Sequence, residues 1–265
     1  MLLRNKVAIV YGGGGAIGGA VARAFAREGA GVFLVGRTME KLYAAAGDIR
    51  SAGGSAEVSV LDALDEDEVI RHSAHVAATA GGIDIVFNAL GIRHVQGVPL
   101  AELSAADFLH PIQTYASAYF ITARAAARHM TPQRSGVIMM LSTPGSRMPG
   151  TGYLGYGVSC AATEAMTRLL AAELGPAGIR VVCIRPHAIP EAAAVGSHSR
   201  DVFEPAARSA GITLDEMMQG VAATTLLKRL PTLDQVAHAA VFAASDHAMS
   251  MTGAVINMTC GAVVD

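Results

Sequence analysis

Short runs of β-branched and other apolar residues alternate along the chain with longer alanine-rich stretches whose apolar positions recur at helical spacing. The short runs predict buried strands, and the long stretches predict helices with one apolar face. Seven strands are expected, at Val7–Tyr11, Val32–Val35, Ala56–Leu61, Ile83–Asn88, Val137–Ser142, Arg180–Arg185 and Ala254–Met258. Six helices are expected, at Ile17–Arg27, Met39–Ala52, Glu66–Ala80, Ser104–Met130, Tyr156–Leu174 and Leu233–Ala244. The alternation predicts an α/β fold with one doubly wound parallel sheet.

One stretch departs from this alternation. Residues 186–218 contain prolines and show weak periodicity, so an inserted loop with a short helix is expected there. Because the insertion follows the sixth strand, at the edge where such sheets bind ligands, it is predicted to be a lid over a substrate. The helix that begins with the capping pattern Ser104-x-x-Asp107 is expected to bend near Pro111. No linker or internal repeat indicates a second domain, so residues 1–265 are taken as one domain.

Composition narrows the classes of partner. The chain is 52% hydrophobic and 16% charged, with a formal net charge of -2, so it offers no field for nucleic acid or an anionic membrane. A small-molecule substrate is the expected partner. The three cysteines, Cys160, Cys183 and Cys260, are far apart and indicate neither a disulfide framework nor a zinc or other metal site. Reduced thiols, and no leader or membrane-spanning run, predict a cytoplasmic protein.

A glycine-rich turn follows the first expected strand. The chain reads Tyr11-Gly12-Gly13-Gly14-Gly15-Ala16-Ile17-Gly18-Gly19 and then becomes helical. Glycines in this place allow a tight turn and bring backbone N–H groups and the helix N-terminus to a pyrophosphate, whereas glycine runs elsewhere are often plain flexible turns. The strand-to-helix context therefore predicts a dinucleotide site. The residues expected to contact the cofactor here are Gly12, Gly14, Gly15, Ile17 and Gly18.

The end of the second strand indicates which dinucleotide is bound. A site for the unphosphorylated cofactor usually has an acid here against the ribose 2′-OH, but this chain has Gly36-Arg37. A guanidinium suits a 2′-phosphate, so NADP(H) is favoured over NAD(H). The alternative is that Arg37 is a solvated residue at the start of a helix.

In several further stretches the chain resembles the short-chain dehydrogenase/reductase family. The matching stretches are the glycine turn, Gly36–Leu42, Leu61-Asp62, Asp84–Gly91, Ser142-Thr143, Tyr156, Pro186 and Met251-Thr252-Gly253. The resemblance covers nearly all of the chain and implies a Rossmann-type NAD(P)-dependent oxidoreductase acting on alcohols or carbonyls, assembled as a homotetramer or homodimer. It implies that Asp62 meets the adenine, that Asn88 steadies the sheet beside the ribose, and that Pro186 and Ile189 flank the nicotinamide. Thr38, Ala63 and Ala89 complete the implied cofactor site.

The catalytic half of the family pattern is only partly present. The resemblance places the family's tyrosine at Tyr156 and its serine at Thr143, with Ser142 beside it. The family's lysine position, four residues after the tyrosine, is Cys160, and its asparagine position is Tyr115. Other departures are Tyr11, Ala16 and His187, which stand where the family has a threonine and two glycines.

The missing lysine changes which direction of reaction the site favours. A tyrosine with a pKa near 10 is only about 0.1% phenolate at pH 7, which costs on the order of 4 kcal/mol in a step that needs the base. Carbonyl reduction needs the neutral hydroxyl as an acid, so reduction is the direction that is better retained. His187 could replace the missing cation or be an ordinary loop residue. Cys160 could be a nucleophile or a small buried apolar residue.

Three classes of function follow. The first is a divergent NADP(H)-dependent carbonyl reductase with Tyr156 as the acid and Thr143 or Ser142 polarising the carbonyl. The second is a catalytically impaired homologue that serves as a nucleotide-binding or structural module. The third is a different chemistry on the same scaffold, for which His187 and Cys160 are the residues to test.

Overall fold

A computed structural model describes residues 1–195 and 197–265. Within them, seven strands form one sheet in which every neighbouring pair is parallel, in the order β3-β2-β1-β4-β5-β6-β7. The strands are β1 (Val7–Tyr11), β2 (Gly31–Gly36), β3 (Ser55–Val60), β4 (Ile85–Asn88), β5 (Gly136–Leu141), β6 (Ile179–Pro186) and β7 (Ala254–Met258). The predicted fold class is confirmed; the bounds of β1 and β7 are as expected, and those of the other strands differ from the expected ones by at most two residues.

The strand order reverses between β1 and β4. Tyr11, at the end of β1, is in register with Val35 of β2 on one side and with Asn88 of β4 on the other. The chain runs outward from β1 to β3 and then returns to β4, so the connections after β1 and β4 leave in opposite directions. Such a reversal leaves a crevice at the carboxyl ends of the strands, where doubly wound folds bind ligands.

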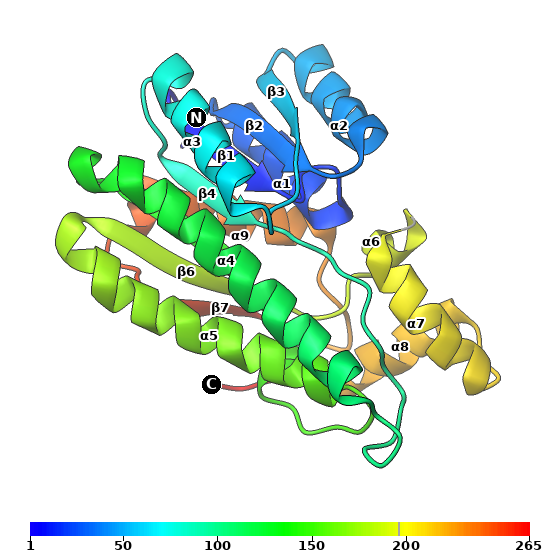
Figure 1. The fold of residues 1–265 in the computed structure, drawn as a ribbon. Coiled ribbons are helices and arrows are strands. Elements are labelled where there is room, and N and C mark those ends of the chain that lie inside the picture. Colours follow the sequence, from blue (N-terminus) through cyan, green and yellow to red (C-terminus); the bar gives the residue numbers. More distant parts are fainter. Residues whose placement is uncertain (196) are drawn as a thin grey trace.

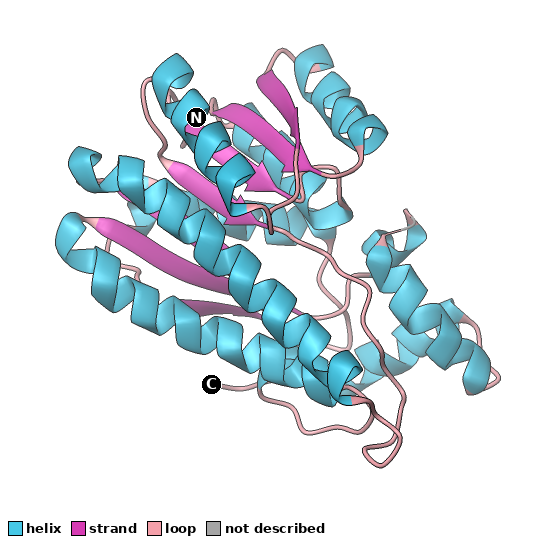
Figure 2. Ribbon diagram, in the orientation of Figure 1, coloured by secondary structure: helices cyan, strands magenta, loops and turns pink. Residues whose placement is uncertain are grey.

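Helices cover both faces of the sheet (Figures 1 and 2). Helices α1, α2 and α9 pack over one face, and α3, α4 and α5 pack over the other. Because both faces are covered, the strands are almost continuously apolar, as the buried residues of β1 and β4 show. The helices are α1 (Ala16–Arg27), α2 (Met39–Ser51), α3 (Glu66–Ala80), α4 (Ala105–Gln133), α5 (Leu154–Leu174) and α9 (Leu233–Ala244).

The insertion after β6 is more helical than expected. Three helices, α6 (Pro190–Ala194), α7 (His198–Ser209) and α8 (Leu214–Thr224), stand where a loop with one short helix was predicted, and Figure 1 shows them beside the main body. Pro190 occupies the first turn of α6, where proline removes no helical hydrogen bond. Thr213 and Glu216 form a reciprocal capping box that starts α8. The prolines thus begin or are tolerated within helices, and the prediction of a loop was wrong.

Helix α4 begins as expected and continues past its expected end. The Ser104 hydroxyl accepts a hydrogen bond from the backbone N–H of Asp107 at 3.0 Å, as the capping pattern predicted. The helix runs without interruption through Pro111 to Gln133.

No helix in the described part of the chain is both long and apolar enough to cross a membrane.

Candidate functional site

The turn between β1 and α1 is built for close approach of a ligand to the backbone. Gly12 has a φ of +75°, and a β-carbon there would collide with the carbonyl of Ala89. Its N–H donates to the carbonyl of Val35 at 2.8 Å, which ties the turn to β2. Gly15 precedes the first helical residue, Ala16, and no side chain caps that helix end. The first-turn N–H groups of α1 are therefore available to an anion.

The two residues expected at the adenosine end lie close together. Arg37 follows β2 and Asp62 follows β3, and their guanidinium and carboxylate groups are 3.8 Å apart. The Arg37 side chain is 66% exposed, so its charge is open to a ligand as well as to Asp62. Thr38 starts α2, and Ala63 is buried beside Asp62.

Asn88 joins three elements at the end of β4. Its side chain is fully buried. Its Oδ1 accepts a hydrogen bond from the hydroxyl of Thr122 on α4 at 3.0 Å, and its Nδ2 donates to the carbonyl of Met139 on β5 at 3.5 Å. Asn88 therefore fixes the end of β4, and with it the turn that carries Ala89 against Gly12.

A second group of side chains surrounds Tyr156, in the first turn of α5. Thr143 follows β5, and its hydroxyl lies 3.3 Å from the sulfur of Cys160, one helical turn after Tyr156. Tyr115 projects from α4, and its ring centroid lies 6.4 Å from that of Tyr156. The positions that the resemblance aligned with the family's serine, tyrosine, lysine and asparagine therefore meet in this fold, although three of the four carry different side chains.

Burial controls the protonation of this group. It raises the pKa of Tyr156 well above the usual value of about 10, with Cys160 and Tyr115 adding to the rise and a hydrogen bond with Thr143 opposing it. Burial also raises the pKa of the Cys160 thiol, whose residue is only 4% exposed. At neutral pH the phenol and the thiol both keep their protons. A raised thiol pKa does not favour a nucleophilic cysteine.

His94 is a neighbour of Tyr156 that the sequence analysis did not identify. The two rings are stacked, with centroids 4.2 Å apart and an interplanar angle of 10°. The Nδ1 atom of His94 lies 3.2 Å from the carbonyl oxygen of Ile92, and its Nε2 atom lies 2.8 Å from Nε2 of Gln96. The carbonyl oxygen accepts a hydrogen bond from Nδ1–H, and the amide of Gln96 donates one to Nε2, so the single ring proton lies on Nδ1. The neutral imidazole lies over one face of the phenol ring. Only its place soon after the fourth strand could have signalled it.

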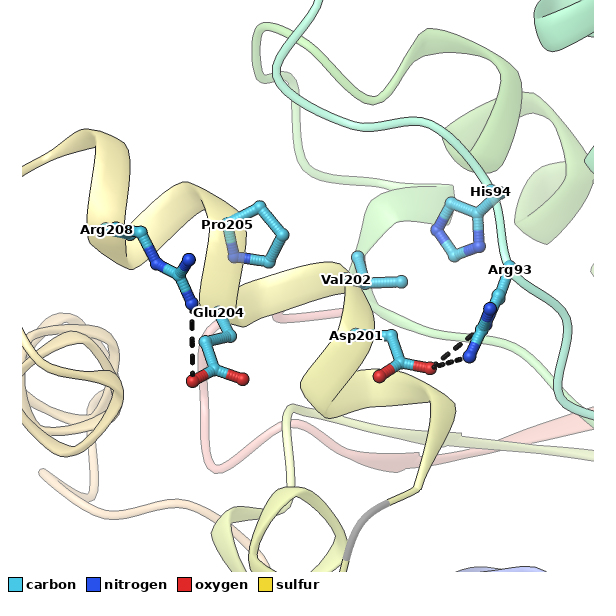
Figure 3. A pocket seen from close by; sticks show the side chains of 7 residues that line it. All are labelled: Arg93, His94, Asp201, Val202, Glu204, Pro205 and Arg208. Atoms are coloured by element: carbon cyan, nitrogen blue, oxygen red, sulfur yellow. Dashed lines mark hydrogen bonds and ion pairs between the residues drawn. The ribbon is translucent and has the colours of Figure 1, made fainter.

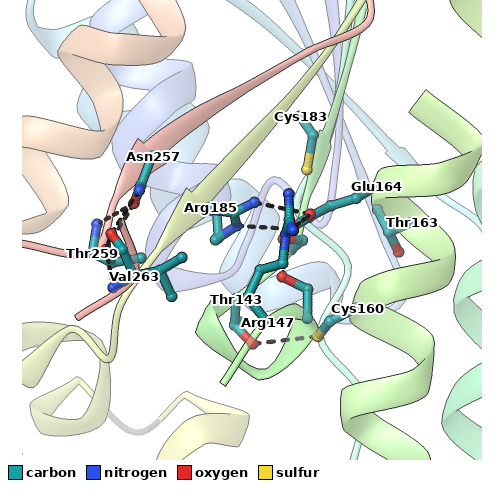
Figure 4. A network of polar contacts seen from close by, with 12 residues as sticks. Thr143, Arg147, Cys160, Thr163, Glu164, Cys183, Arg185, Asn257, Thr259 and Val263 are labelled. Carbon is teal, nitrogen blue, oxygen red and sulfur yellow. Dashed lines mark hydrogen bonds and ion pairs between the residues drawn. The ribbon is translucent and has the colours of Figure 1, made fainter. Parts of the chain in front are cut away.

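Ser142 belongs to a different network, which centres on Glu164 and Arg185, both labelled in Figure 4. The hydroxyls of Ser142 and Ser146 each donate to Oε1 of Glu164 at 2.6 Å. Arg185, which is fully buried at the end of β6, donates to both oxygens of Glu164 at 2.7 and 2.9 Å. Its other terminal nitrogen donates to the carboxylate of Asp265 at 2.8 and 2.9 Å.

The carboxylate of Glu164 holds this network together. Burial alone would raise the pKa of Glu164, but hydrogen bonds from Arg185, Ser142 and Ser146 outweigh it and keep the pKa below its usual value. Ser142 and Ser146 flank Thr143, and both are tied to the same oxygen, so the network anchors the turn that presents Thr143 to Tyr156.

A pocket of about 640 Å³ separates the segment after β4 from α7 (Figure 3). Arg93 and His94 line one side. The other side is lined by five residues of α7, namely Asp201, Val202, Glu204, Pro205 and Arg208. The Arg93 guanidinium pairs with the Asp201 carboxylate at 3.0 Å. His94 both lines this pocket and stacks on Tyr156, although Tyr156 is not itself among the lining residues.

Helix α7 also meets the segment after β4 at Gly91. The ring of His198, the first residue of α7, occupies the space that a β-carbon on Gly91 would fill. The remaining cofactor residues predicted from the resemblance, Pro186 and Ile189, end β6 and precede α6. Across residues 1–195 and 197–265, no three potential ligands gather in a group that could hold a metal ion.

The predicted cofactor residues all lie at the carboxyl ends of the strands. They are Gly12, Gly14, Gly15, Ile17 and Gly18 around the turn after β1, Arg37 and Thr38 after β2, Asp62 and Ala63 after β3, Asn88 and Ala89 at β4, and Pro186 and Ile189 at β6. Of the predicted catalytic residues, the structure brings Thr143 to Tyr156 and directs the hydroxyl of Ser142 to Glu164.

Comparisons with known proteins agree on the kind of protein. The profile of a family described as enoyl-(acyl carrier protein) reductase matches residues 14–262. Tropinone reductase-like 2 of Erythroxylum coca is 31% identical over 262 residues, which are 97% of this chain and 89% of that protein. The uncharacterized oxidoreductase YuxG of Bacillus subtilis is also 31% identical over 97% of this chain, but the chain spans only 37% of its length. The crystal structure of a dehydrogenase/reductase from Sinorhizobium meliloti superposes with a TM-score of 0.83 at 26% identity, covering 99% of this chain and 96% of that one.

Proposed function

The chain belongs to the short-chain dehydrogenase/reductase family, and on that premise we propose that it is an NADP(H)-dependent oxidoreductase that reduces a small carbonyl compound. The observation that carries the direction of reaction is the enclosure of Tyr156 by His94, Tyr115 and Cys160, with burial raising the pKa of its phenol. A phenol that keeps its proton is equipped to act as an acid.

The residues at the carboxyl edge suit the dinucleotide. The Gly12 turn and the uncapped start of α1 would hold the pyrophosphate, because no side chain stands between the backbone and the ligand. Arg37 would meet the 2′-phosphate through charge-assisted hydrogen bonds, which supports NADP(H) over NAD(H). Asn88 would fix the strand end beside the ribose. The bound cofactor supplies the hydride.

Two hydroxyl groups would act on the substrate oxygen. Tyr156 donates its proton to the carbonyl oxygen as negative charge develops there, and Thr143 donates a second hydrogen bond that polarises the carbonyl. Ser142 is a weaker candidate for this role because its hydroxyl already donates to Glu164. Helices α6, α7 and α8 are proposed as the lid over the substrate.

Alcohol oxidation should be the weaker direction. Among the groups that set the pKa of Tyr156 there is no cation, and Cys160 stands where the family's lysine would favour the phenolate. Forming a phenolate with a pKa of 10 or more costs on the order of 4 kcal/mol at pH 7. Reduction avoids this cost, since the starting state of the acid is the neutral phenol.

The proposal extends to assembly and location. Large apolar side chains are exposed on α4 and α5, among them Phe120, Leu154 and Leu169, and this supports pairing of these helices in a homodimer or homotetramer.

The three cysteines form no disulfide. That is the state expected in the cytoplasm, where we propose that the protein works.

A substrate screen tests the function directly. NADPH consumption is followed with a panel of small ketones and aldehydes for the wild-type protein and for Tyr156→Phe. We expect slow turnover by the wild type and a loss of roughly 100- to 10,000-fold in Tyr156→Phe, with cofactor binding nearly intact. Binding of NADPH without turnover of any carbonyl would support the nucleotide-binding module instead. Unchanged turnover in Tyr156→Phe would show that the acid is another group.

A further inference from the structure

We propose that Glu164 is a positioning residue for the carbonyl reduction: through the hydroxyls of Ser142 and Ser146 it holds the Thr143 hydroxyl at the substrate oxygen. This inference rests on the proposed function, because it names what keeps one of the two proposed donors in place. The carboxylate acts through the two serines and not on the substrate itself.

The Thr143 hydroxyl is presented by the turn between β5 and α5. Thr143 has an extended backbone and precedes a single turn of 3₁₀ helix, η1 (Pro144–Ser146). Its carbonyl accepts a hydrogen bond from the N–H of Ser146 at 3.0 Å. Neither a strand nor a helix includes Thr143, so the position of its side chain depends on how the residues on either side of it are held.

Two side chains hold this turn from opposite sides of Thr143. Ser142 precedes it and Ser146 ends η1, and both hydroxyls donate to Oε1 of Glu164 at 2.6 Å. Hydrogen bonds of this length to an ionised acceptor are among the strong ones in proteins. One carboxylate oxygen therefore clamps both ends of the segment that carries the Thr143 hydroxyl.

The clamp is itself fixed independently of the turn. Glu164 is buried on α5, and the buried Arg185 donates to both of its oxygens at 2.7 and 2.9 Å (Figure 4). These bonds and those from the serines keep the pKa of Glu164 below its usual value, so the group is ionised at neutral pH. An ionised carboxylate is an acceptor only, so it can receive both serines and Arg185 at once.

This arrangement relates the two proposed donors to each other. Tyr156 and Glu164 lie on the same helix, and Glu164 holds both flanks of Thr143, so the Thr143 hydroxyl is located relative to the phenol through α5. A misplacement of a reacting group by about 1 Å can cost on the order of 100-fold in rate. The clamp should therefore act on kcat and leave substrate binding unaffected.

Removal of both serine hydroxyls tests this role while the ion pair stays in place. Glu164 is kept, because its removal would take a charged partner from the buried Arg185 and destabilise the fold. With NADPH and a carbonyl that the wild type turns over, we expect Ser142→Ala and Ser146→Ala each to lower kcat a few-fold. The double variant should lose roughly 10- to 100-fold in kcat, with KM and the dissociation constant of NADPH nearly unchanged. Ser142→Ala/Ser146→Thr keeps one donor to Glu164 and should recover the activity of Ser142→Ala.

A matched control removes two buried hydroxyls of α5 that do not face the turn. Thr163 and Thr167 donate to backbone carbonyls of their own helix at 2.9 Å. Thr163→Val/Thr167→Val should leave kcat nearly unchanged. Melting curves of both double variants show whether a difference in kcat reflects a difference in stability.

A double-mutant cycle with Thr143→Val separates positioning from a general loss of structure. If Glu164 acts through Thr143, loss of both serine hydroxyls has little further effect once the Thr143 hydroxyl is absent. Additive losses, or an unchanged kcat when both serines are replaced, overturn the inference while leaving the reductase function in place. Failure of the wild type to turn over any carbonyl overturns both. If the double variant does not fold, Ser146→Ala alone decides, because its loss must vanish in the Thr143→Val background and a loss that persists contradicts the inference.

Discussion

The imidazole of His94 lies flat against the phenol of Tyr156, with ring centroids 4.2 Å apart and an interplanar angle of 10°. This stack keeps water from one face of the phenol and contributes to the burial that raises the pKa of Tyr156. An acid is lost as the pH rises through its pKa. Carbonyl reduction by the wild type should therefore show no loss from phenol ionisation up to about pH 10.

Removal of the His94 ring should lower the pH at which ionisation of Tyr156 reduces reductase activity. In His94→Ala water reaches the phenol, the pKa of Tyr156 falls toward its usual value, and the alkaline loss of reductase activity moves to lower pH. His94→Phe is the matched control because it keeps an aromatic ring on the phenol. Rate against pH for the three proteins checks the prediction, and superimposable profiles for His94→Ala and the wild type would contradict it.

The two hydroxyls beside Tyr156 should differ in their effect on catalysis. Thr143→Val removes a group that meets Tyr156, so we expect a loss of roughly 10- to 100-fold in kcat/KM. Ser142→Ala removes a donor to Glu164, which keeps hydrogen bonds from Arg185 and Ser146, so activity should fall only a few-fold. Steady-state kinetics of both variants test the assignment. A larger loss in Ser142→Ala than in Thr143→Val would reverse it.

Arg37 should set the choice of cofactor. At a hundred times its dissociation constant, a bound cofactor adds about 2.7 kcal/mol of stability, so melting temperatures report relative affinity. At equal concentrations we expect NADPH to raise the melting temperature more than NADH does, and Arg37→Ala to remove most of the difference. Equal shifts in the wild type, or a preference unaffected by Arg37→Ala, would refute the role of the guanidinium.

Cys160→Lys should restore part of the missing electrostatics. Position 160 lies one turn after Tyr156, and its sulfur meets the hydroxyl of Thr143, so an ammonium there would lower the pKa of the phenol. Oxidation should gain more than reduction, since only oxidation needs the phenolate, and the pH optimum of oxidation should fall. The larger side chain in a buried position should cost typically 1–3 kcal/mol of stability.

Oxidation rates against pH, with a melting curve, check this variant. Cys160→Met is a matched control because it adds volume without charge. A stable, cofactor-binding Cys160→Lys protein with an unchanged rate and pH profile would contradict the role assigned to position 160.

His72 should make the fold sensitive to acid. It is buried on α3, neither ring nitrogen has a hydrogen-bond partner among the described residues, and burial lowers its pKa from 6.5 to about 4. The folded state therefore binds this proton less readily than the unfolded chain does. This difference leaves the free energy of unfolding unaffected above about pH 6.5. As the pH falls toward 4, the protonation of His72 in the unfolded chain lowers the free energy of unfolding by roughly 3 kcal/mol in all.

Denaturant unfolding at pH 7 and pH 4.5 measures this effect. His72→Leu should lose less stability between the two pH values than the wild type does. His247→Gln is the control, because His247 is exposed and is not among the groups that lower the pKa of His72. An equal pH dependence in His72→Leu and the wild type would exclude His72 as the cause.

The sheet could be predicted from the sequence because its signals are local. Apolar runs such as Val7–Tyr11 are buried on both faces, and glycine turns mark their ends. The helices after β6 were missed because their prolines looked like helix breakers. Pro190 in fact starts α6, and the reciprocal cap of Thr213 and Glu216 starts α8.

The site was predictable where a residue belongs to a recognised spacing and obscure where only the fold creates the contact. Tyr156 and Cys160 share a helix face, so their meeting follows from their four-residue spacing. His94 reaches Tyr156 from a segment without regular structure, and no periodicity describes such a segment. The resemblance placed the family's serine at Thr143 and left Ser142 beside it as a second candidate, and the hydrogen bond from Ser142 to Glu164 distinguishes the two.

The contact between Gly91 and His198 has a consequence for how the sequence can change. The imidazole occupies the space that a side chain at position 91 would need, although the two residues are far apart in the chain. A mutation of either residue therefore changes the effect of a mutation of the other, which is epistasis between the segment after β4 and helix α7. An alanine at position 91 requires the imidazole of His198 to move, and a smaller residue at position 198 removes that requirement. A side chain at position 91 is therefore accommodated most easily after position 198 has changed.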